Sequence, residues 1–212
     1  MVKDKICKTL RKDIILGKLN PGERLIESAL SENYKVSRGM IREALALLSN
    51  EGFVTITPHK GAAVAKISTK DLEDYYGLLA ILERKATELA VPTLTEADIE
   101  KLNGINSAIK TAMNSDSETK LQDWGKLNLS FHRYFWDRCE NDKLGWLVEI
   151  VRQRIFRYRY TLFMITSYDE YLQDHAQIID CIKNKDPKNA GQAMEMHVQR
   201  ALNVLLKFFS HT

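Results

Sequence analysis

The sequence has few of the residues that interrupt helices. Its 212 residues include only 4 prolines and 10 glycines. Because both residue types are poorly tolerated inside helices, their scarcity favours a mainly helical chain. Apolar residues make up 44% and charged residues 28%, which excludes a disordered chain and permits real hydrophobic cores. A chain of this length suits one large domain or two small ones.

Cysteine is also scarce, and long apolar runs are missing. The three cysteines, Cys7, Cys139 and Cys181, are far apart and form no CxxC pair. This argues against a disulfide framework and for a reducing cytosol. Residues 1–10 lack the apolar run of a signal peptide, and no stretch approaches the roughly 18 apolar residues of a membrane span. We therefore expect a cytoplasmic protein with no membrane partner.

Charge is distributed unevenly along the chain. Residues 1–66 hold 12 Lys and Arg against 7 Asp and Glu, a net charge of +5. Residues 67–212 hold 19 against 21, a net charge of −2. A basic first third followed by a slightly acidic remainder is typical of a nucleic-acid module joined to a different module, although chance clustering gives the same pattern.

The first third has the pattern of three helices and a hairpin. Apolar spacing predicts helices over about 6–15, 26–34 and 37–50, and Ser37 is a good N-cap for the third. Residues 53–57 are rich in strand formers, a turn follows at 58–61, and 62–65 returns as a second strand. This order predicts a winged helix-turn-helix domain over residues 1–66.

Basic residues fall where such a domain touches DNA. Arg38 and Arg42 lie four residues apart, on one face of the third helix, and arginine binds guanine edges or phosphate. Arg24 precedes the second helix, and Lys60 stands at the hairpin tip, where phosphate contacts are expected. A lone arginine is more often a solvated surface charge, so it is the four basic residues together that indicate DNA binding.

Residues 67–70 read as a linker, and the rest of the chain is helical in pattern. Breaks fall at Pro92, 114–116, 141–142, 166–167 and 186–187. The pattern predicts a second domain over 71–212, an all-α bundle of six helices near 71–91, 95–113, 118–139, 143–164, 168–184 and 187–209.

Three histidines of the second domain lie on apolar stripes. His132, His175 and His197 each belong to a different predicted helix. One buried histidine is usually a hydrogen-bonded core residue, but burying three requires partners, and a divalent metal satisfies all of them. Asn128, one turn before His132, offers its carbonyl oxygen as a fourth ligand. Satisfied core histidines in a helical interaction module remain an alternative.

The N-terminal motifs closely resemble those of the GntR family of repressors. They are Gly17-x3-Pro21-Gly22-x-Arg24-Leu25, Ser37-Arg38-x3-Arg42-Glu43-Ala44-Leu45-x2-Leu48-x2-Glu51-Gly52, and Gly61-x2-Val64. The resemblance implies a homodimer on a palindromic double-stranded operator. It places Arg24, Arg38, Arg42 and the wing at Lys60 and Gly61 on the DNA, with Ser37 at the start of the reading helix. Gly39-Met40-Ile41 departs from the family, which often has a proline there.

Residues 71–212 resemble the FCD ligand-binding domain of the FadR branch, in its smaller VanR-like form. The resembling pieces are Leu82-Glu83, Asn128-x2-Phe131-His132, His175, Asp186-Pro187-x2-Ala190 and Met194-x2-His197. The resemblance implies a divalent metal, zinc, nickel or manganese, held by Asn128, His132, His175 and His197. It also implies a small organic acid effector bound at this metal.

Two residues depart from the FCD pattern. Many members have aspartate at position 128, and asparagine is a weaker ligand. Many have arginine at position 79, where it helps to hold the effector, and this chain has Leu79. Either the effector is less anionic, or another base contacts it. The run Arg152, Arg154, Arg157 and Arg159 is a candidate source, with Arg152 and Arg154 favoured, although a solvated stripe is the simpler interpretation for at least two of them.

The rival functions are a metal-dependent hydrolase-like enzyme and a metal sensor. A catalytic zinc also has three protein ligands and an open position. The sequence, however, has no HExxH motif to place a carboxylate base beside a ligand, and no P-loop, GxGxxG or GxSxG motif. We therefore expect a ligand-responsive transcription regulator that acts as a repressor, and not an enzyme.

Overall fold

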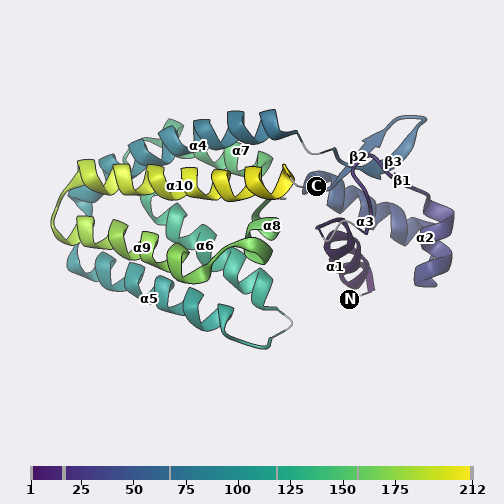
Figure 1. The fold of residues 1–212 in the computed structure, drawn as a ribbon, viewed down its shortest axis with the longest axis horizontal. Coiled ribbons are helices and arrows are strands. Elements are labelled where there is room, and N and C mark those ends of the chain that lie inside the picture. The colour runs from purple at the N-terminus through teal and green to yellow at the C-terminus, as the bar shows by residue number, and fades with distance from the viewer. Residues whose placement is uncertain (1, 16–17, 67, 118, 157, 211–212) are drawn as a thin grey trace. The chain divides into compact units, whose positions relative to one another are not determined.

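A computed structural model describes residues 2–15, 18–66, 68–117, 119–156 and 158–210 (Figure 1). Gly17, part of the first motif, lies outside the described residues. Contacts between residues divide the chain into two compact units, Met1–Ser68 and Thr69–Thr212. Each unit is described by itself below.

The first unit is a winged helix-turn-helix. Its helices are α1 (Val2–Ile15), α2 (Glu27–Tyr34) and α3 (Arg38–Asn50), and its strands are β1 (Arg24–Leu25), β2 (Val54–Thr57) and β3 (Gly61–Val64). The strands form an antiparallel sheet in the order β1-β3-β2. The three helices and the hairpin were predicted, whereas the two-residue β1 was not.

Helix α3 is held at both ends and along one face. The Ser37 hydroxyl accepts a hydrogen bond from the Met40 amide at 3.3 Å, which confirms the predicted N-cap. The apolar stripe of α3 is buried, and its opposite face is left to solvent; the buried residues are Ile41, Ala44, Leu45 and Leu48. At the far end Arg11 of α1 makes a bidentate ion pair with Glu51, with Nε at 2.9 Å and Nη2 at 2.6 Å from Oε2.

The second unit is an all-α bundle, as predicted. It contains α4 (Thr69–Ala90), a 3₁₀ turn η1 (Val91–Thr93), α5 (Glu96–Met113), α6 (Lys120–Trp136), α7 (Asp142–Arg154), α8 (Tyr158–Ile165), α9 (Tyr168–Lys183) and α10 (Pro187–Phe209). Two expectations were wrong. Thr69 and Lys70 begin α4 instead of belonging to the linker, and the single helix expected over 143–164 is two helices, so the described part of this unit has seven α-helices instead of six.

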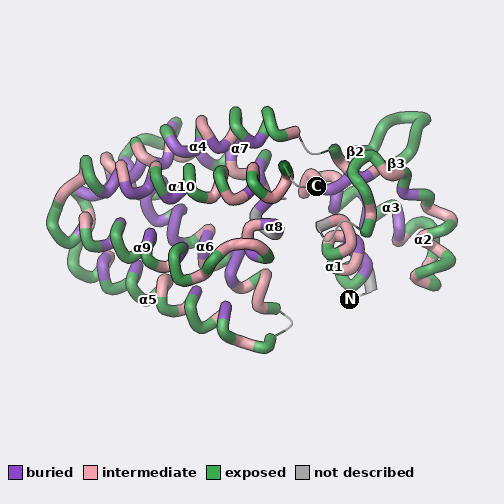
Figure 2. Tube along the Cα trace, in the orientation of Figure 1, coloured by how far each residue is buried: buried purple, intermediate pink, exposed green. Residues whose placement is uncertain are grey.

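The core of the bundle lies between α5, α6, α9 and α10, whose inward faces are the buried segments of Figure 2. Phe131 and Phe135 of α6 pack there with Ile178 of α9 and Met194 of α10. Helix α10 also packs closely on α4: a Cβ added at Gly191 would stand 2.5 Å from Cγ of Glu88. Among the described residues, no helix is both long and apolar enough to cross a membrane.

Candidate metal centre and nucleic-acid interface

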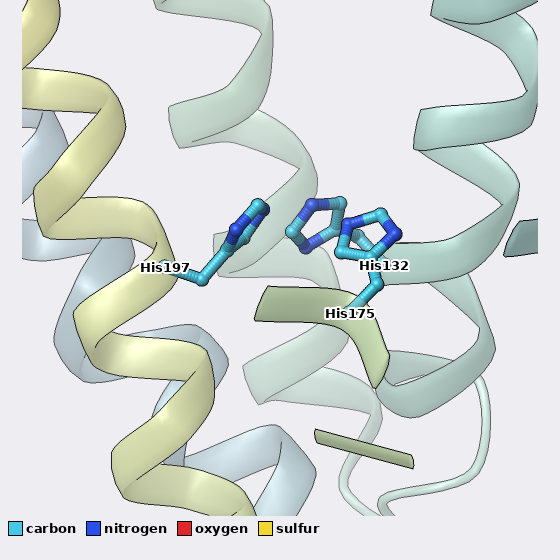
Figure 3. Close-up of side chains that lie close together, drawn as sticks. All are labelled: His132, His175 and His197. Atoms are coloured by element: carbon cyan, nitrogen blue, oxygen red, sulfur yellow. The ribbon is translucent and has the colours of Figure 1, made fainter. Parts of the chain in front are cut away.

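The structure brings the three inward histidines together. His132 comes from α6, His175 from α9 and His197 from α10, and Figure 3 shows their rings side by side. One ring nitrogen from each lies within 4.8 Å of those of the other two, and all three side chains are buried. Helices distant in sequence therefore supply three nitrogen donors to one small space.

A ring of oxygen acceptors orients these imidazoles. In each ring Nδ1 faces a side-chain oxygen: Glu83 Oε2 at 2.6 Å from His132, Asn106 Oδ1 at 3.2 Å from His175, and Asp174 Oδ2 at 3.2 Å from His197. An Nδ1–H that donates to an oxygen leaves Nε2 with its lone pair directed elsewhere. Nε2 of His175 is buried and has no hydrogen-bond partner, so its lone pair is available to bind a metal ion.

The electrostatics keep His132 and His175 neutral and Glu83 charged. Burial, assisted by the positive charge of Arg152, lowers the pKa of His132 to about 4. Burial also lowers the pKa of His175 well below its usual value. Burial alone would raise the pKa of Glu83, but Arg152 and His132 outweigh it and lower that pKa to about 2. Near neutral pH His132 and His175 are therefore neutral imidazoles, the form that binds metals.

Asn128 is buried beside the cluster and is already hydrogen-bonded. The Tyr171 hydroxyl donates to Asn128 Oδ1. Burial raises the pKa of Tyr171, so its hydroxyl keeps its proton and acts as a donor. An amide oxygen has two lone pairs, so one remains for a metal. Three imidazoles with outer-shell oxygen partners, one unpaired Nε2 and a neighbouring amide oxygen fit a divalent metal ion.

A cavity of about 230 Å³ adjoins the histidine cluster. His132, His197, Asn128 and Arg152 line it together with many apolar side chains. Arg152 lines the cavity and pairs with Glu83, and its contact with an effector stays a prediction. Arg154 is exposed and does not line this cavity. Arg157 lies outside the described residues, and the side chain of Arg159 is not described.

Sequence reasoning missed most of the outer partners. Glu83 had been noted only through its resemblance to a family motif, and Asn106 and Asp174 had not been noted at all. Glu83 and Asp174 had a detectable signal, since each is an acid on the apolar face of its helix. Asn106 is half-buried and gave no such signal.

The predicted DNA-contacting residues are all exposed on the first unit; they are Arg24, Ser37, Arg38, Arg42, Lys60 and Gly61. Arg42 is not buried in an internal ion pair: its side chain is 68% exposed, and its Nε binds Glu27 Oε2 at 2.7 Å. Arg24 Nη2 donates to the Lys60 carbonyl at 3.2 Å, which ties β1 to the hairpin tip. Gly61 has a φ of +84°, a conformation that glycine adopts without strain.

The winged helix with its exposed basic residues, followed in the same chain by a helical ligand-binding bundle, defines a DNA-binding regulator. The chain belongs to the GntR family of bacterial regulatory proteins. The model of that family matches residues 2–64, and the FCD domain model matches residues 74–200. It is therefore a transcription regulator with an FCD effector-binding domain, and the resemblance seen in the sequence is confirmed.

Relatives support this assignment over nearly the whole chain. The chain is 30% identical to the HTH-type transcriptional regulator YdhC of Bacillus subtilis over 193 residues, covering 89% of this chain and 84% of the relative. It is 27% identical to the HTH-type transcriptional repressor RspR of Escherichia coli over 200 residues, covering 93% and 86%. The solved structure of E. coli McbR/YncC shares the fold with a TM-score of 0.66 at 20% identity, covering 99% of each chain. The matched GntR family and the relatives YdhC and RspR are transcription regulators and not enzymes, so the hydrolase alternative is wrong.

Proposed function

We propose that this regulator is a repressor that binds a palindromic operator as a homodimer and responds to a small carboxylate held at a divalent metal in its FCD domain. The observation that carries the proposal is the convergence of His132, His175 and His197, each with Nδ1 held by an oxygen. Its relative RspR is named a repressor, which supports the direction of the response.

In this proposal the three Nε2 atoms and Asn128 Oδ1 bind a zinc, nickel or manganese ion. The metal supplies positive charge that attracts a carboxylate into the cavity. Arg152 already uses Nε to bind Glu83, so Nη1 and Nη2 are the atoms with which it contacts the carboxylate. One small anion is thus held from two sides.

In the first unit, Arg38 and Arg42 contact base edges and phosphates in the major groove from the exposed face of α3. Ser37 fixes the first turn of α3, so that its backbone amides face the DNA. Arg24 and Lys60 contact phosphates, and Gly61 permits the hairpin tip to approach the duplex closely.

Helix α4 couples the two activities. It begins at Thr69, directly after the DNA-binding unit, and it carries Glu83, which contacts both His132 and Arg152. A ligand that binds Arg152 alters the contacts of Glu83 with Arg152 and His132. Because Glu83 belongs to α4, the preferred position of α4 changes as well. A coupling of about 1–3 kcal/mol would change operator affinity roughly 5- to 150-fold.

An apolar patch on α4 and α7 serves as the homodimer interface. The two helices pack against each other, and each exposes two large apolar side chains; these are Leu78 and Ile81 on α4, and Trp146 and Leu147 on α7. Large apolar side chains gathered on adjacent helices mark an interaction surface. A regulator that reads a palindrome needs a second copy of itself, which supplies an identical patch.

The proposal is tested on the purified full chain. Metal content is measured by mass spectrometry, and binding to the DNA upstream of its own gene is measured by fluorescence anisotropy with and without metal and carboxylates. His175→Ala should lose the metal and the response to carboxylates while keeping DNA binding. Gln177→Ala, an exposed neighbour on α9, serves as the control and should behave as the unmodified chain. Full metal occupancy in His175→Ala contradicts the ligand assignment, and a response to metal alone identifies a metal sensor instead.

A further inference from the structure

Away from the histidine cluster, most of the described wall of the cavity is apolar; the uncharged exceptions are Tyr76, Gln153 and the buried Trp124 Nε1, which has no hydrogen-bond partner. Helices α4, α6, α8 and α10 and the two residues that follow α7 contribute apolar side chains to it; they are Leu79, Trp124, Leu129, Trp136, Ile155, Phe156, Leu162, Val198 and Ala201. Leu79, Trp124 and Val198 are each almost fully buried. A ligand that fills this cavity therefore loses most of its hydration and regains few hydrogen bonds outside the cluster.

Among the described lining residues, enclosed positive charge is confined to Arg152. Of the two arginines among the described lining residues, Arg152 is the more enclosed, with a side chain that is 15% exposed, and Glu83 balances its charge. Arg133 also lines the cavity, but it is exposed and pairs with Asp137 at 3.1 Å. Glu149, which is exposed as well, adds a negative charge to the rim. A second anionic group placed deep in the cavity would meet no buried cation in the part of the wall that the structure describes.

The size of the cavity limits the ligand. A cavity of about 150 Å³ accepts benzene, a molecule of six non-hydrogen atoms. At the same packing, the cavity of about 230 Å³ accepts about nine such atoms. A carboxylate group uses three of them, which leaves about six for the rest of the molecule.

We propose that the effector is a monocarboxylate whose single charged group lies at the histidine cluster and Arg152 and whose body is an apolar ring or chain of about six carbon atoms. The apolar wall formed by residues such as Leu79 and Leu162 selects against a second carboxylate. This inference rests on the proposed function, since it takes the metal-bound carboxylate as given and adds the chemistry of the remaining atoms.

The experiment compares matched acids on the metal-loaded full chain by titration calorimetry, after the metal content has been measured. The probes are benzoate, cyclohexanecarboxylate, isophthalate, succinate and the uncharged benzamide. We expect benzoate and cyclohexanecarboxylate to bind at least about tenfold more tightly than isophthalate, succinate or benzamide. If isophthalate or succinate binds as tightly as benzoate, the inference is overturned while the proposed function stands. If no carboxylate binds to metal-loaded protein, the proposed carboxylate response fails and the inference fails with it.

A matched pair of variants on α8 tests the wall directly. Leu162 lines the cavity and is only partly buried, so Leu162→Gln introduces a polar group there with little risk to folding. Met164, on the same helix, is exposed and does not line the cavity. Leu162→Gln should weaken benzoate binding about tenfold without changing metal content, and Met164→Gln should leave both unchanged. Equal benzoate affinity in both variants would contradict an apolar wall that touches the ligand.

Discussion

At the scale of single residues, the exposed ion pair of Arg42 would prepare this side chain for the proposed DNA contact. Its guanidinium binds Glu27 across the gap between α2 and α3, and both side chains remain accessible. Exposed pairs of this kind contribute about 0–1 kcal/mol, so DNA displaces Glu27 at little cost. Meanwhile the pair limits the conformations of a long side chain before binding.

Arg42→Ala should therefore weaken binding to the operator by about 1–3 kcal/mol, because a bidentate contact to a base is lost. Anisotropy titrations against operator and unrelated DNA measure the change. Lys110→Ala, which removes an exposed positive charge from α5, is the control. Unchanged operator affinity would rule out a direct contact, and an equal loss on both DNAs would assign Arg42 to phosphate.

Asn128→Asp should raise the affinity for the metal about tenfold or more, because a carboxylate adds negative charge beside neutral imidazoles. Competition with a chelator of known affinity measures it. Asn103→Asp, on the exposed face of α5, introduces the same charge elsewhere and should have no effect. Equal metal affinity in the two variants would remove Asn128 from the ligand set.

The residue scale also shows what a sequence reveals about a site. The apolar stripes predicted that His132, His175 and His197 point inward, and they do. Arg152 lines the cavity and Arg154 does not, because two residues of separation on a helix correspond to about 200° of rotation. The pairing of Glu83 with His132 joins residues 49 apart, and no local pattern encodes it.

At the scale of elements, helix ends with local signals were predictable, and those set by packing were not. Asn141 and Asp186 cap α7 and α10 with their side chains, and the sequence placed breaks at both. The break between α7 and α8 contains neither proline nor glycine. Ile155 and Tyr158 are buried on either side of it, so tertiary packing ends α7 there. The two-residue β1 is likewise defined only by its pairing with β3.

Asp98 links two elements and makes their junction sensitive to acid. It completes the capping box of α5 with Thr95 and accepts a hydrogen bond from the Tyr134 hydroxyl of α6 at 2.5 Å. The hydrogen bonds from Thr95 and Tyr134 lower the pKa of Asp98 to about 2, from an ordinary value of 3.8. The carboxylate therefore stabilises the fold fully above about pH 4, and this contribution is lost as the pH falls from 3.8 towards 2.

Asp98→Asn should lower the free energy of unfolding at pH 7 by about 1 kcal/mol, the size of a helix cap with partial solvent screening. Urea unfolding at pH 7 and pH 3 measures it. The difference between the variant and the unmodified chain should shrink at the lower pH, where Asp98 begins to take up a proton. Glu100→Gln, on the exposed side of the same helix, should change neither value. A difference independent of pH would contradict the role of the ionised carboxylate.

At the scale of the whole molecule, one DNA-binding unit cannot contact both half-sites of a palindromic operator. Two half-sites lie about 34–36 Å apart or a multiple of this, so specific binding requires two copies held at a fixed spacing. In the proposed dimer the apolar patch on α4 and α7 would provide the contact between copies, and α4 is also the helix that carries Glu83. A single helix therefore joins the effector site, the proposed dimer contact and the chain segment that leads to the DNA-binding unit.

Trp146→Glu tests this arrangement, because Trp146 is 59% exposed in the isolated chain and lies on the outward face of α7. Two glutamates brought together across a symmetric interface repel each other, and the contact of a large aromatic side chain is lost. We expect the dimer dissociation constant to rise at least about 30-fold, which corresponds to about 2 kcal/mol. Sedimentation over a range of concentrations measures it. Met164→Glu, which replaces an exposed apolar residue of α8, should remain dimeric.

The DNA measurements on the same variants separate dimerisation from recognition. The Trp146→Glu chain keeps every residue of the first unit, so it should still bind a DNA carrying one half-site as the unmodified chain does. It should lose the additional affinity that the unmodified chain gains on a full palindrome, since that gain comes from linking two half-site contacts. A Trp146→Glu chain that is dimeric at nanomolar concentration would place the interface elsewhere. If the Trp146→Glu chain is monomeric but binds palindromic DNA as tightly as the unmodified chain, α4 and α7 do not set the distance between the two copies of α3.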